Sequence, residues 1–232
     1  MITVQSDGAV GVITLDGHAK RNALDVDHLD QLDIAVTECV AGGSRALVIT
    51  GAGTSFCSGA DLTGVYGEGF RTSLYRALRN ISHAAVPVIA AINGPAIGAG
   101  TQLAIACDLR IAVPEARFAV PTARNGLAVD PWTIRRLTAL AGGATARALL
   151  LACATLDPEL ALARGLIDRI GTLNEALALA HDITEMSTMS LAYSKQALTA
   201  LFEQSSWDQT LNDEFDACWA AADSARAESR TT

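Results

Sequence analysis

The sequence predicts an α/β fold with a helical C-terminal part. Short apolar strands alternate with amphipathic helices in the first half of the chain, whereas helical periodicity dominates from Asp130 onward. The 232 residues are 50% hydrophobic and 18% charged, which is normal for a compact globular protein and sufficient to bury a core. We therefore expect a core that contains the strands, followed by a helical region.

Local patterns predict the N-terminal elements. Apolar and polar residues alternate in ITVQ and GVITL, and Asp7-Gly8 between them favours a turn, so we expect a β-hairpin. Apolar side chains recur at helical spacing in DVDHLDQLDIAVTECV, and Gly42-Gly43 ends this helix. Further along we expect a buried strand over 46–50, a loop over 51–62, a helix over 68–82, and strands over 86–92 and 109–113.

The second half reads as mostly helical. The runs 131–142, 144–152 and 158–166 have helical periodicity, and a strand-like segment, LIDRIG, follows at 166–171. Three amphipathic helices should then begin near Leu173, Leu191 and Trp207.

The run INGPAIGAGTQLAIACDL, residues 92–109, has no charged side chain before Asp108 and contains three glycines. A membrane helix needs about 20 apolar residues in unbroken helix, and Pro95 and Gln102 interrupt this run. A dinucleotide-binding fingerprint needs G-x-G-x-x-G directly after a strand. Here Gly98-Ala99-Gly100 lies in the middle of the chain and a leucine takes the place of the last glycine, so we favour a third interpretation.

In this third interpretation, residues 93–97 form a turn and a helix begins near Gly98. The first N–H groups of a helix have no internal partner and lie at the positive end of its dipole, so they suit a developing oxyanion. The absence of side chains at Gly98 and Gly100 would let a substrate carbonyl approach closely. A packing role for these glycines is the alternative.

Composition excludes several classes of function. The formal net charge of −8 and a pI near 4.9 work against a nucleic-acid or anionic-membrane partner. The five cysteines are odd in number and form no C-x-x-C pair, so we expect buried thiols in a reducing cytoplasm, with neither a disulfide framework nor a zinc site. We expect no bound metal, because no metal-ligand spacing is present, and no secretory signal, because the N-terminus lacks a basic region.

Four segments in the same order resemble the enoyl-CoA hydratase/isomerase (crotonase) family. They are RNALD at 21–25, TGAGTSFCSGADL at 50–62, NGPAIGAGTQLAIACDLRIA at 93–112 and ALARGLIDRI at 161–170. The resemblance implies a crotonase-like (ClpP/crotonase) fold, in which residues 1–172 form a β-β-α spiral core that binds acyl-CoA. It also implies that residues 173–232 form a C-terminal helical region for trimerisation, giving a homotrimer or a hexamer.

The resemblance also implies where a coenzyme A thioester lies. Two backbone N–H groups of the family form an oxyanion hole that polarises the thioester carbonyl, and they match Ala60 and Ala99. The thioester would be a substrate or ligand, and no separate cofactor is expected. The segments that resemble the coenzyme A walls contain Lys20, Arg21, Ala23, Leu24, Ala60, Asp61 and Leu62, with Lys20 or Arg21 near phosphate.

The chemistry implied by the family is incomplete in this chain. Hydratases of the family use two glutamates, and their positions match Gln102 and Thr122, neither of which is a general base at neutral pH. Asp130 matches a catalytic aspartate of the dienoyl-CoA isomerase branch. The alternative for Asp130 is a helix N-cap, because Asp-Pro precedes an apolar-periodic helix.

Three functions follow as hypotheses. The first is a hydratase-deficient protein that binds fatty acyl-CoA and delivers it to other fatty-acid enzymes, as in bacterial paralogues linked to mycolate-type elongation. The second is an enoyl- or dienoyl-CoA isomerase that uses Asp130 as its base. The third is a true enoyl-CoA hydratase with relocated catalytic groups. We expect a cytoplasmic protein without a transmembrane segment in each case.

Overall fold

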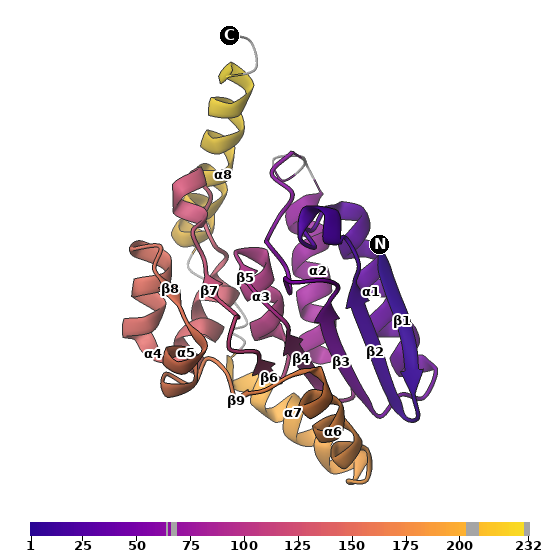
Figure 1. Ribbon diagram of the computed structural model, residues 1–232. Coiled ribbons are helices and arrows are strands. Elements are labelled where there is room, and N and C mark those ends of the chain that lie inside the picture. Colours follow the sequence, from indigo (N-terminus) through magenta and orange to yellow (C-terminus); the bar gives the residue numbers. More distant parts are fainter. Residues whose placement is uncertain (64, 66–68, 203–208, 230–232) are drawn as a thin grey trace.

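The computed structural model describes residues 1–63, 65, 69–202 and 209–229 and has the α/β architecture that the sequence predicts (Figure 1). The strands are β1 (Ile2–Asp7), β2 (Val10–Leu15), β3 (Ala46–Gly51), β4 (Val88–Ile92), β5 (Ala96–Ile97), β6 (Leu109–Ala112), β7 (Phe118–Ala119), β8 (Thr155–Leu156) and β9 (Arg169–Ile170). The α-helices are α1 (Val26–Ala41), α2 (Phe70–His83), α3 (Ala99–Ala106), α4 (Pro131–Leu151), α5 (Pro158–Ala163), α6 (Leu173–Thr184), α7 (Thr188–Phe202) and α8 (Gln209–Ser229). Two short 3-10 helices, η1 (His18–Lys20) and η2 (Thr122–Asn125), complete the described elements.

The strands form two sheets. The larger sheet has the order β1-β2-β3-β4-β6-β9, in which β1 and β2 pair antiparallel and all other neighbours pair parallel. The smaller sheet has the order β5-β7-β8. Because the parallel strands are covered on both faces, β3 and β4 are buried along their whole lengths, as expected for apolar runs such as ALVITG and VIAAI.

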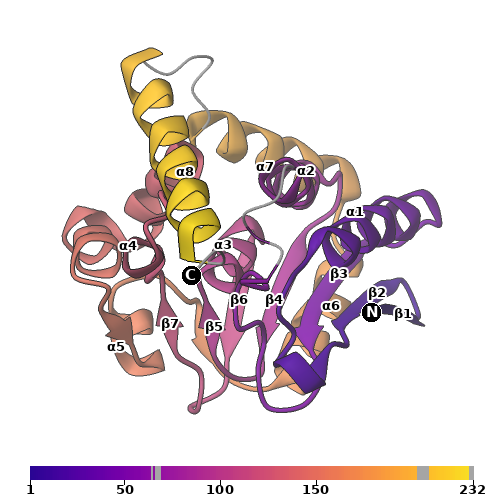
Figure 2. The same ribbon diagram turned by 90° about the horizontal axis from the view of Figure 1, so that it is seen from above.

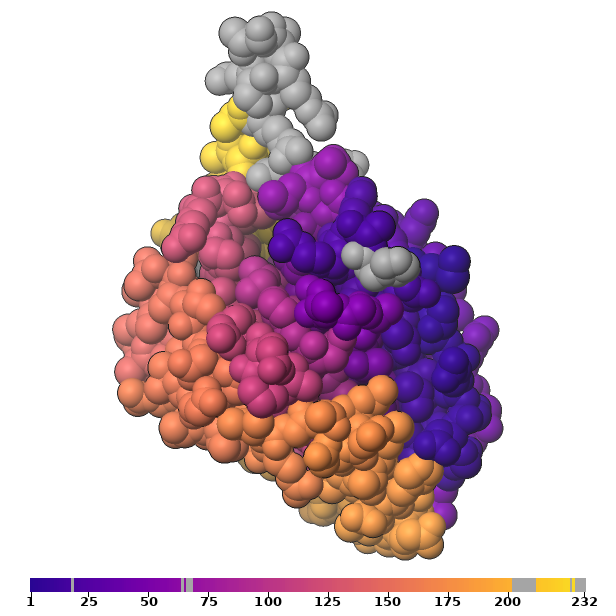
Figure 3. All heavy atoms as spheres, in the orientation of Figure 1, coloured from indigo at the N-terminus to yellow at the C-terminus, as the bar shows by residue number. Residues whose placement is uncertain are grey.

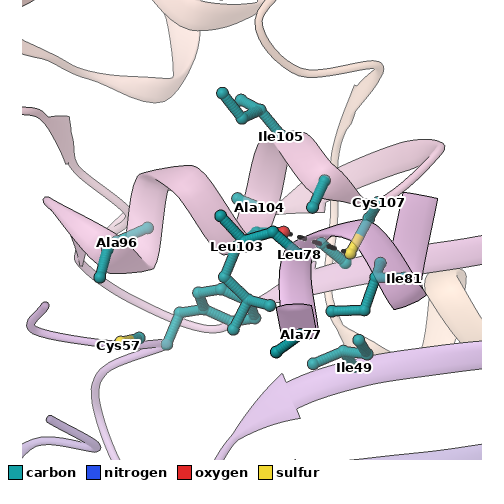
Figure 4. Packing of buried hydrophobic residues seen from close by; sticks show 14 of the residues in the cluster. Ile49, Cys57, Ala77, Leu78, Ile81, Ala96, Leu103, Ala104, Ile105 and Cys107 are labelled. Carbon is teal, nitrogen blue, oxygen red and sulfur yellow. Dashed lines mark hydrogen bonds between the residues drawn. The ribbon is translucent and has the colours of Figure 1, made fainter. Parts of the chain in front are cut away.

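Helices cover the larger sheet on opposite faces. Seen from above, α1 and α2 lie on one side of β3 and β4, and α6 lies on the other (Figure 2). The space-filling view shows the orange atoms of the α6 region against the indigo atoms of the N-terminal strands (Figure 3). The main core lies between the sheet, α2 and α3, where α2 side chains such as Leu78 lie next to α3 side chains such as Leu103 (Figure 4).

Helix α3 explains why the run 92–109 lacks charge. All eight of its residues are buried, so charged side chains would have to be desolvated there. The helix begins at Ala99, one residue after the predicted start, and Gly98 is its N-cap. The predicted turn over 93–97 differs in one detail, because residues 96 and 97 form the short strand β5 and pair with β7.

Most predicted elements are present, with differences at their ends. The two helices predicted over 131–142 and 144–152 form α4, which contains a kink at Gly142, where φ is 78° and ψ is 155°. LIDRIG contributes only the two-residue strand β9, and the strands β7 and β8 were not predicted because each has only two residues. The expected helix starts at Glu68 and Trp207 lie outside the described residues, and the helices there are described from Phe70 and Gln209.

The C-terminal helices pack in two different ways. Helix α7 is fixed to the core by Lys195, whose buried ammonium group donates to the carbonyl oxygens of Ile81 and Val86 and pairs with Asp108 at 2.7 Å. Helix α8 crosses the upper part of the molecule and ends well above it (Figure 1). None of the described helices is both long and apolar enough to cross a membrane.

Candidate functional site

Two short parallel bridges bring the loop after β3 against the start of α3. Cys57 pairs with Ala96, and Leu24 pairs with Ala60. The second bridge uses the carbonyl oxygen of residue 59 and the N–H of residue 61, both bonded to Leu24 at 2.8 and 2.7 Å. The segments predicted to hold coenzyme A, 20–24 and 60–62, therefore lie side by side.

The glycines of the run 92–109 have different roles. A side-chain carbon on Gly94 would lie 2.1 Å from the carbonyl oxygen of Thr54, and one on Gly100 would lie 2.3 Å from that of Cys57. The expectation that Gly100 makes room for a substrate is therefore wrong, and packing explains this glycine. Gly98 is different, because a side-chain carbon added there would meet no atom within 4 Å. Its φ of 54° is one that residues other than glycine rarely adopt.

Two residues with unbonded backbone N–H groups, Ala60 and Ala99, lie where these segments converge and line one cavity. Ala99 is the first residue of α3, and Gly98 provides no side-chain cap. Among the hydrogen bonds of the described residues, none uses the N–H of Ala99 or of Ala60. A side-chain carbon on Gly59 would lie only 3.9 Å from the nitrogen of Ala99. Two free donors beside one helix N-terminus can stabilise a negatively polarised oxygen.

Both alanines line one cavity of about 150 Å³. Its apolar wall includes Leu62, Phe70 and Leu74, and Trp219 of α8 also lines it. The indole nitrogen of Trp219 donates to the carbonyl oxygen of Ala128 at 3.2 Å, which ties α8 to the segment before α4. The cavity thus joins backbone donors to apolar surface, a combination suited to an acyl group.

Gln102 and Thr122, the two positions at which the resemblance implies glutamates, also line this cavity. The side chain of Gln102 is part of a buried network with Asp130 and Thr133. Its amide nitrogen lies 3.2 Å from Oδ2 of Asp130 and 2.9 Å from Oγ1 of Thr133. Two of the three predicted catalytic positions are therefore in contact, because the amide of Gln102 donates a hydrogen bond to the carboxylate of Asp130.

Asp130 caps α4. Its carboxylate accepts the backbone N–H of Thr133 at 3.0 Å and the hydroxyl of Thr133 at 2.5 Å, and the residue is only 6% exposed. Burial raises the pKa of Asp130 above its ordinary value, although the bonds from Thr133 oppose this shift. Asp130 lines a neighbouring cavity together with Tyr75 and Trp132, and it is not among the residues that line the cavity of Ala60 and Ala99.

Lys20 and Asp61 form an ion pair at the rim. The ammonium group of Lys20 lies 2.7 Å from Oδ2 of Asp61, and the lysine side chain is largely exposed. Hydrogen bonds from Lys20 and Thr63 hold the pKa of Asp61 well below its usual range, so the carboxylate stays ionised. Arg21 is exposed and has a φ of 53°.

The role of Asn22 was not predicted from the sequence. Its side chain is 1% exposed, donates to the carbonyl oxygens of Ala52 and Ser55, and accepts the N–H of Gly17. It thereby fixes the loop that carries Ala60. The residue type alone was a weak signal for this role. Asparagine tolerates a left-handed backbone conformation better than most residues, and Asn22 has a φ of 58°.

Helix α8 is anchored beside the cavity by Arg71 of α2. The guanidinium carbon lies 5.4 Å from the ring centre of Phe215 and 5.0 Å from that of Trp219, and the group pairs with Asp216 at 2.8 Å. The described residues include no cluster of three or more histidine, cysteine, aspartate or glutamate side chains arranged to hold a metal ion.

Comparison with known proteins gives one consistent result. A sequence model of the enoyl-CoA hydratase/isomerase family matches residues 5–226, from β1 into α8. The probable enoyl-CoA hydratase echA6 of Mycobacterium tuberculosis is 42% identical over 199 residues, which cover 85% of this chain and 82% of the relative. The short-chain-enoyl-CoA hydratase of Clostridium acetobutylicum is 30% identical over 210 residues, covering 85% of this chain and 80% of the relative.

Solved structures agree with the sequence matches. A probable enoyl-CoA hydratase/isomerase from Mycobacterium abscessus superimposes with a TM-score of 0.80 at 28% identity, covering 92% of this chain and 87% of the other. A monofunctional enoyl CoA isomerase from M. smegmatis gives a TM-score of 0.77 at 25% identity, covering 88% of this chain and 95% of the other.

Proposed function

Because this chain belongs to the enoyl-CoA hydratase/isomerase family, we propose that it binds a fatty acyl-CoA thioester with the carbonyl oxygen between the N–H groups of Ala60 and Ala99. The family resemblance and the crotonase-like fold expected from the sequence are confirmed by these matches. The observation that carries the proposal is the pair of unbonded N–H groups beside one largely apolar cavity. The rim segment 20–24 would hold the coenzyme A part, with Lys20 near phosphate.

Hydration by this protein should be very slow. Positioned acids and bases typically contribute about 10²- to 10⁴-fold each, and the two cavity positions that would carry them are neutral Gln102 and Thr122. Such contributions do not add simply, yet loss of both leaves only polarisation by the backbone donors. We therefore favour binding of the thioester over its hydration, with delivery to other fatty-acid enzymes, including mycolate-type elongation, as the extension that the resemblance implies.

An isomerase that uses Asp130 is the second candidate. Its support is the raised pKa of this buried carboxyl, which is the shift expected of a general base working near neutral pH. The arrangement around it weakens the case, because its oxygens already accept from Gln102 and Thr133. Asp130 would have to exchange one of these bonds to reach a proton on the acyl chain.

Removal of one backbone donor tests the binding proposal. Ala99→Pro deletes the N–H of Ala99 at the first position of a helix, where proline is tolerated, and Ala99→Ser is the matched control that keeps it. The thermal stabilisation by butyryl-CoA should exceed that by free coenzyme A in the wild type and in Ala99→Ser, and the excess should shrink in Ala99→Pro. Equal stabilisation of the wild type by both ligands would refute the proposal. Crotonyl-CoA hydration at ordinary enzymatic rates would refute the claim of deficiency.

Self-association is proposed from the surface of α7. Apolar side chains that are well exposed in the single chain follow this helix, namely Met189, Tyr193, Leu198 and Leu201. Exposed apolar stripes of this kind are typical of contacts between subunits. A homotrimer or a hexamer would cover them, and light scattering of the purified protein measures which assembly forms.

A further inference from the structure

Helix α8 buries few of its side chains. Among those whose exposure the structure describes, only Trp219 and Ala222 are buried, whereas the shorter helix α2 buries seven residues. A side-chain carbon on Gly126 would lie 3.7 Å from Cβ of Ala222, so this part of α8 rests on the loop before α4. Beyond this contact the helix extends well above the molecule (Figure 1). Few buried apolar contacts are typical of segments that open locally.

The face of α8 that meets the core lines two cavities. Trp219 lines the cavity of about 150 Å³ that contains the proposed thioester site, here called the acyl cavity. Asn212 and Phe215 line the neighbouring cavity of about 220 Å³. Tyr75 of α2 lines both cavities, and its ring centre lies 6.4 Å from that of Phe215. A movement of α8 would therefore change both cavities at once.

Arg71 of α2 holds this face of α8. Its guanidinium group donates to Oδ1 of Asp216 at 2.8 Å, and the guanidinium carbon lies 5.4 Å from the ring centre of Phe215 and 5.0 Å from that of Trp219. These contacts are partly exposed to solvent, where each one is individually weak. Arg71 is not among the residues that line either cavity, so its effect on a ligand there would act through α8.

We propose that α8 is a lid on the acyl cavity and that Arg71 is the latch that keeps it closed. The inference rests on the proposed binding of the thioester in this cavity. A cavity of about 150 Å³ holds an apolar group of about six carbon atoms, so a hexanoyl group would fill it and contact Trp219. Release of such a group requires α8 to withdraw, whereas free coenzyme A, which has no acyl group, leaves without this movement. Lid opening of this kind limits ligand release in many proteins.

A trapped polar group on the core side favours opening of the lid. The indole nitrogen of Trp132 is buried without a hydrogen-bond partner, and it is the only such side-chain atom among the described residues. A buried donor without an acceptor is destabilising. Trp132 lines the neighbouring cavity together with Asn212 and Phe215, so withdrawal of α8 opens this cavity to water that can bond to the indole N–H. The closed position thus combines weak attachment with one unfavourable contact.

The test measures the opening of α8 and the release of the ligand in the same variants. Opening is followed by amide hydrogen exchange of α8, and release by stopped-flow dissociation of hexanoyl-CoA and of free coenzyme A. Arg71→Met keeps an extended side chain but removes the charge. In this variant we expect exchange in α8 and dissociation of hexanoyl-CoA to accelerate by about fivefold to fiftyfold, the range that loss of the three contacts supports. Dissociation of free coenzyme A should not change.

Two further variants control the test. Arg76 also lies on α2 but pairs with Asp30 and Asp33 of α1, so Arg76→Met should change neither the exchange in α8 nor the dissociation of hexanoyl-CoA. Asp216→Asn removes the charged partner of Arg71 and should accelerate both by a smaller factor. This second variant keeps the test decisive if Arg71→Met folds poorly.

The lid is refuted if Arg71→Met and Asp216→Asn accelerate exchange in α8 but leave the dissociation of hexanoyl-CoA unchanged. Unchanged exchange in both variants would refute the latch. Failure of hexanoyl-CoA to bind the wild type more tightly than free coenzyme A would instead refute the proposed function, so the failures are distinguishable.

Discussion

Gln102→Glu tests the buried network directly, because it places a carboxylate where an amide now donates to Asp130. The amide nitrogen of Gln102 lies 3.2 Å from Oδ2 of Asp130, and in the variant an oxygen takes its place. Two unit charges at this distance repel by about 5 kcal/mol at an effective dielectric constant of about 20. The variant also loses the hydrogen bonds to Asp130 and Thr133, each of which contributes about 1 kcal/mol.

The pair can avoid most of this repulsion by retaining one proton, which raises the pKa of one carboxyl in the folded protein. In the unfolded chain a glutamate has a pKa of about 4.3. Between these two pKa values the folded state holds a proton that the unfolded state has lost, so the free energy of unfolding falls as the pH rises. We expect the variant to be less stable than the wild type by about 2 kcal/mol at pH 5 and by about 4 kcal/mol at pH 7.

Urea unfolding at both pH values measures this difference. Each variant is compared with the wild type at the same pH, because Asp130 itself gives the wild type a pH dependence. The matched control is the double variant Gln102→Glu, Asp130→Asn, in which a neutral amide faces the new carboxylate and the additional loss at pH 7 should disappear. An equal loss at pH 5 and pH 7 in Gln102→Glu would show that the two side chains are not coupled and would refute the network.

Three further predictions concern stability and are measured by urea or thermal unfolding. Gly100→Ala should lower the free energy of unfolding by about 3 kcal/mol through overpacking. In the control Gly17→Ala the added carbon meets its neighbours at ordinary distances of 3.5 Å or more, so the loss should be less than about 0.5 kcal/mol. Equal losses in the two variants would contradict the packing role of Gly100. Lys195→Met leaves Asp108 without its ion pair and should cost roughly 2 kcal/mol, while an unchanged midpoint would mean that α7 does not need this anchor. Because burial raises the pKa of Asp130, the contribution of this carboxyl to stability should fall as the pH rises from 3.8 through that raised pKa, so the stability of Asp130→Asn should increase relative to that of the wild type over this range.

The elements of the fold could be predicted because their signals are local. The hairpin, the buried strands β3 and β4 and the start of α3 near Gly98 each follow from a pattern within a dozen residues. The cap at Asp130 also followed from local sequence, since Asp-Pro before an apolar-periodic run is typical of a helix start and the side chain does accept the N–H of Thr133. The strands β7 and β8 lacked any such signal, because two residues are too few for a period to be visible.

The surroundings of the site could not be predicted, because they are made by contacts between distant residues. Gln102 meets Asp130 across 28 positions, and Arg71 meets Asp216 across 145. No pattern in either segment indicates the other. Gly100 shows the same limit, since its sequence context fitted an open substrate site equally well until the carbonyl oxygen of Cys57 was located 2.3 Å from where a side chain would begin.

The proposed separation between thioester binding and proton transfer in this site has a physical basis. The donors at Ala60 and Ala99 belong to the backbone, so they persist through any change of side chain that preserves the loop and the helix start. Acid and base groups belong to side chains, so the substitution of one glutamate by a glutamine removes one such group completely. A chain can therefore lose proton transfer while it keeps the part of the site that polarises a thioester. A neutral amide at this position also suits its surroundings, because the amide nitrogen of Gln102 donates to the neighbouring carboxylate of Asp130 without placing a second charge in the buried network.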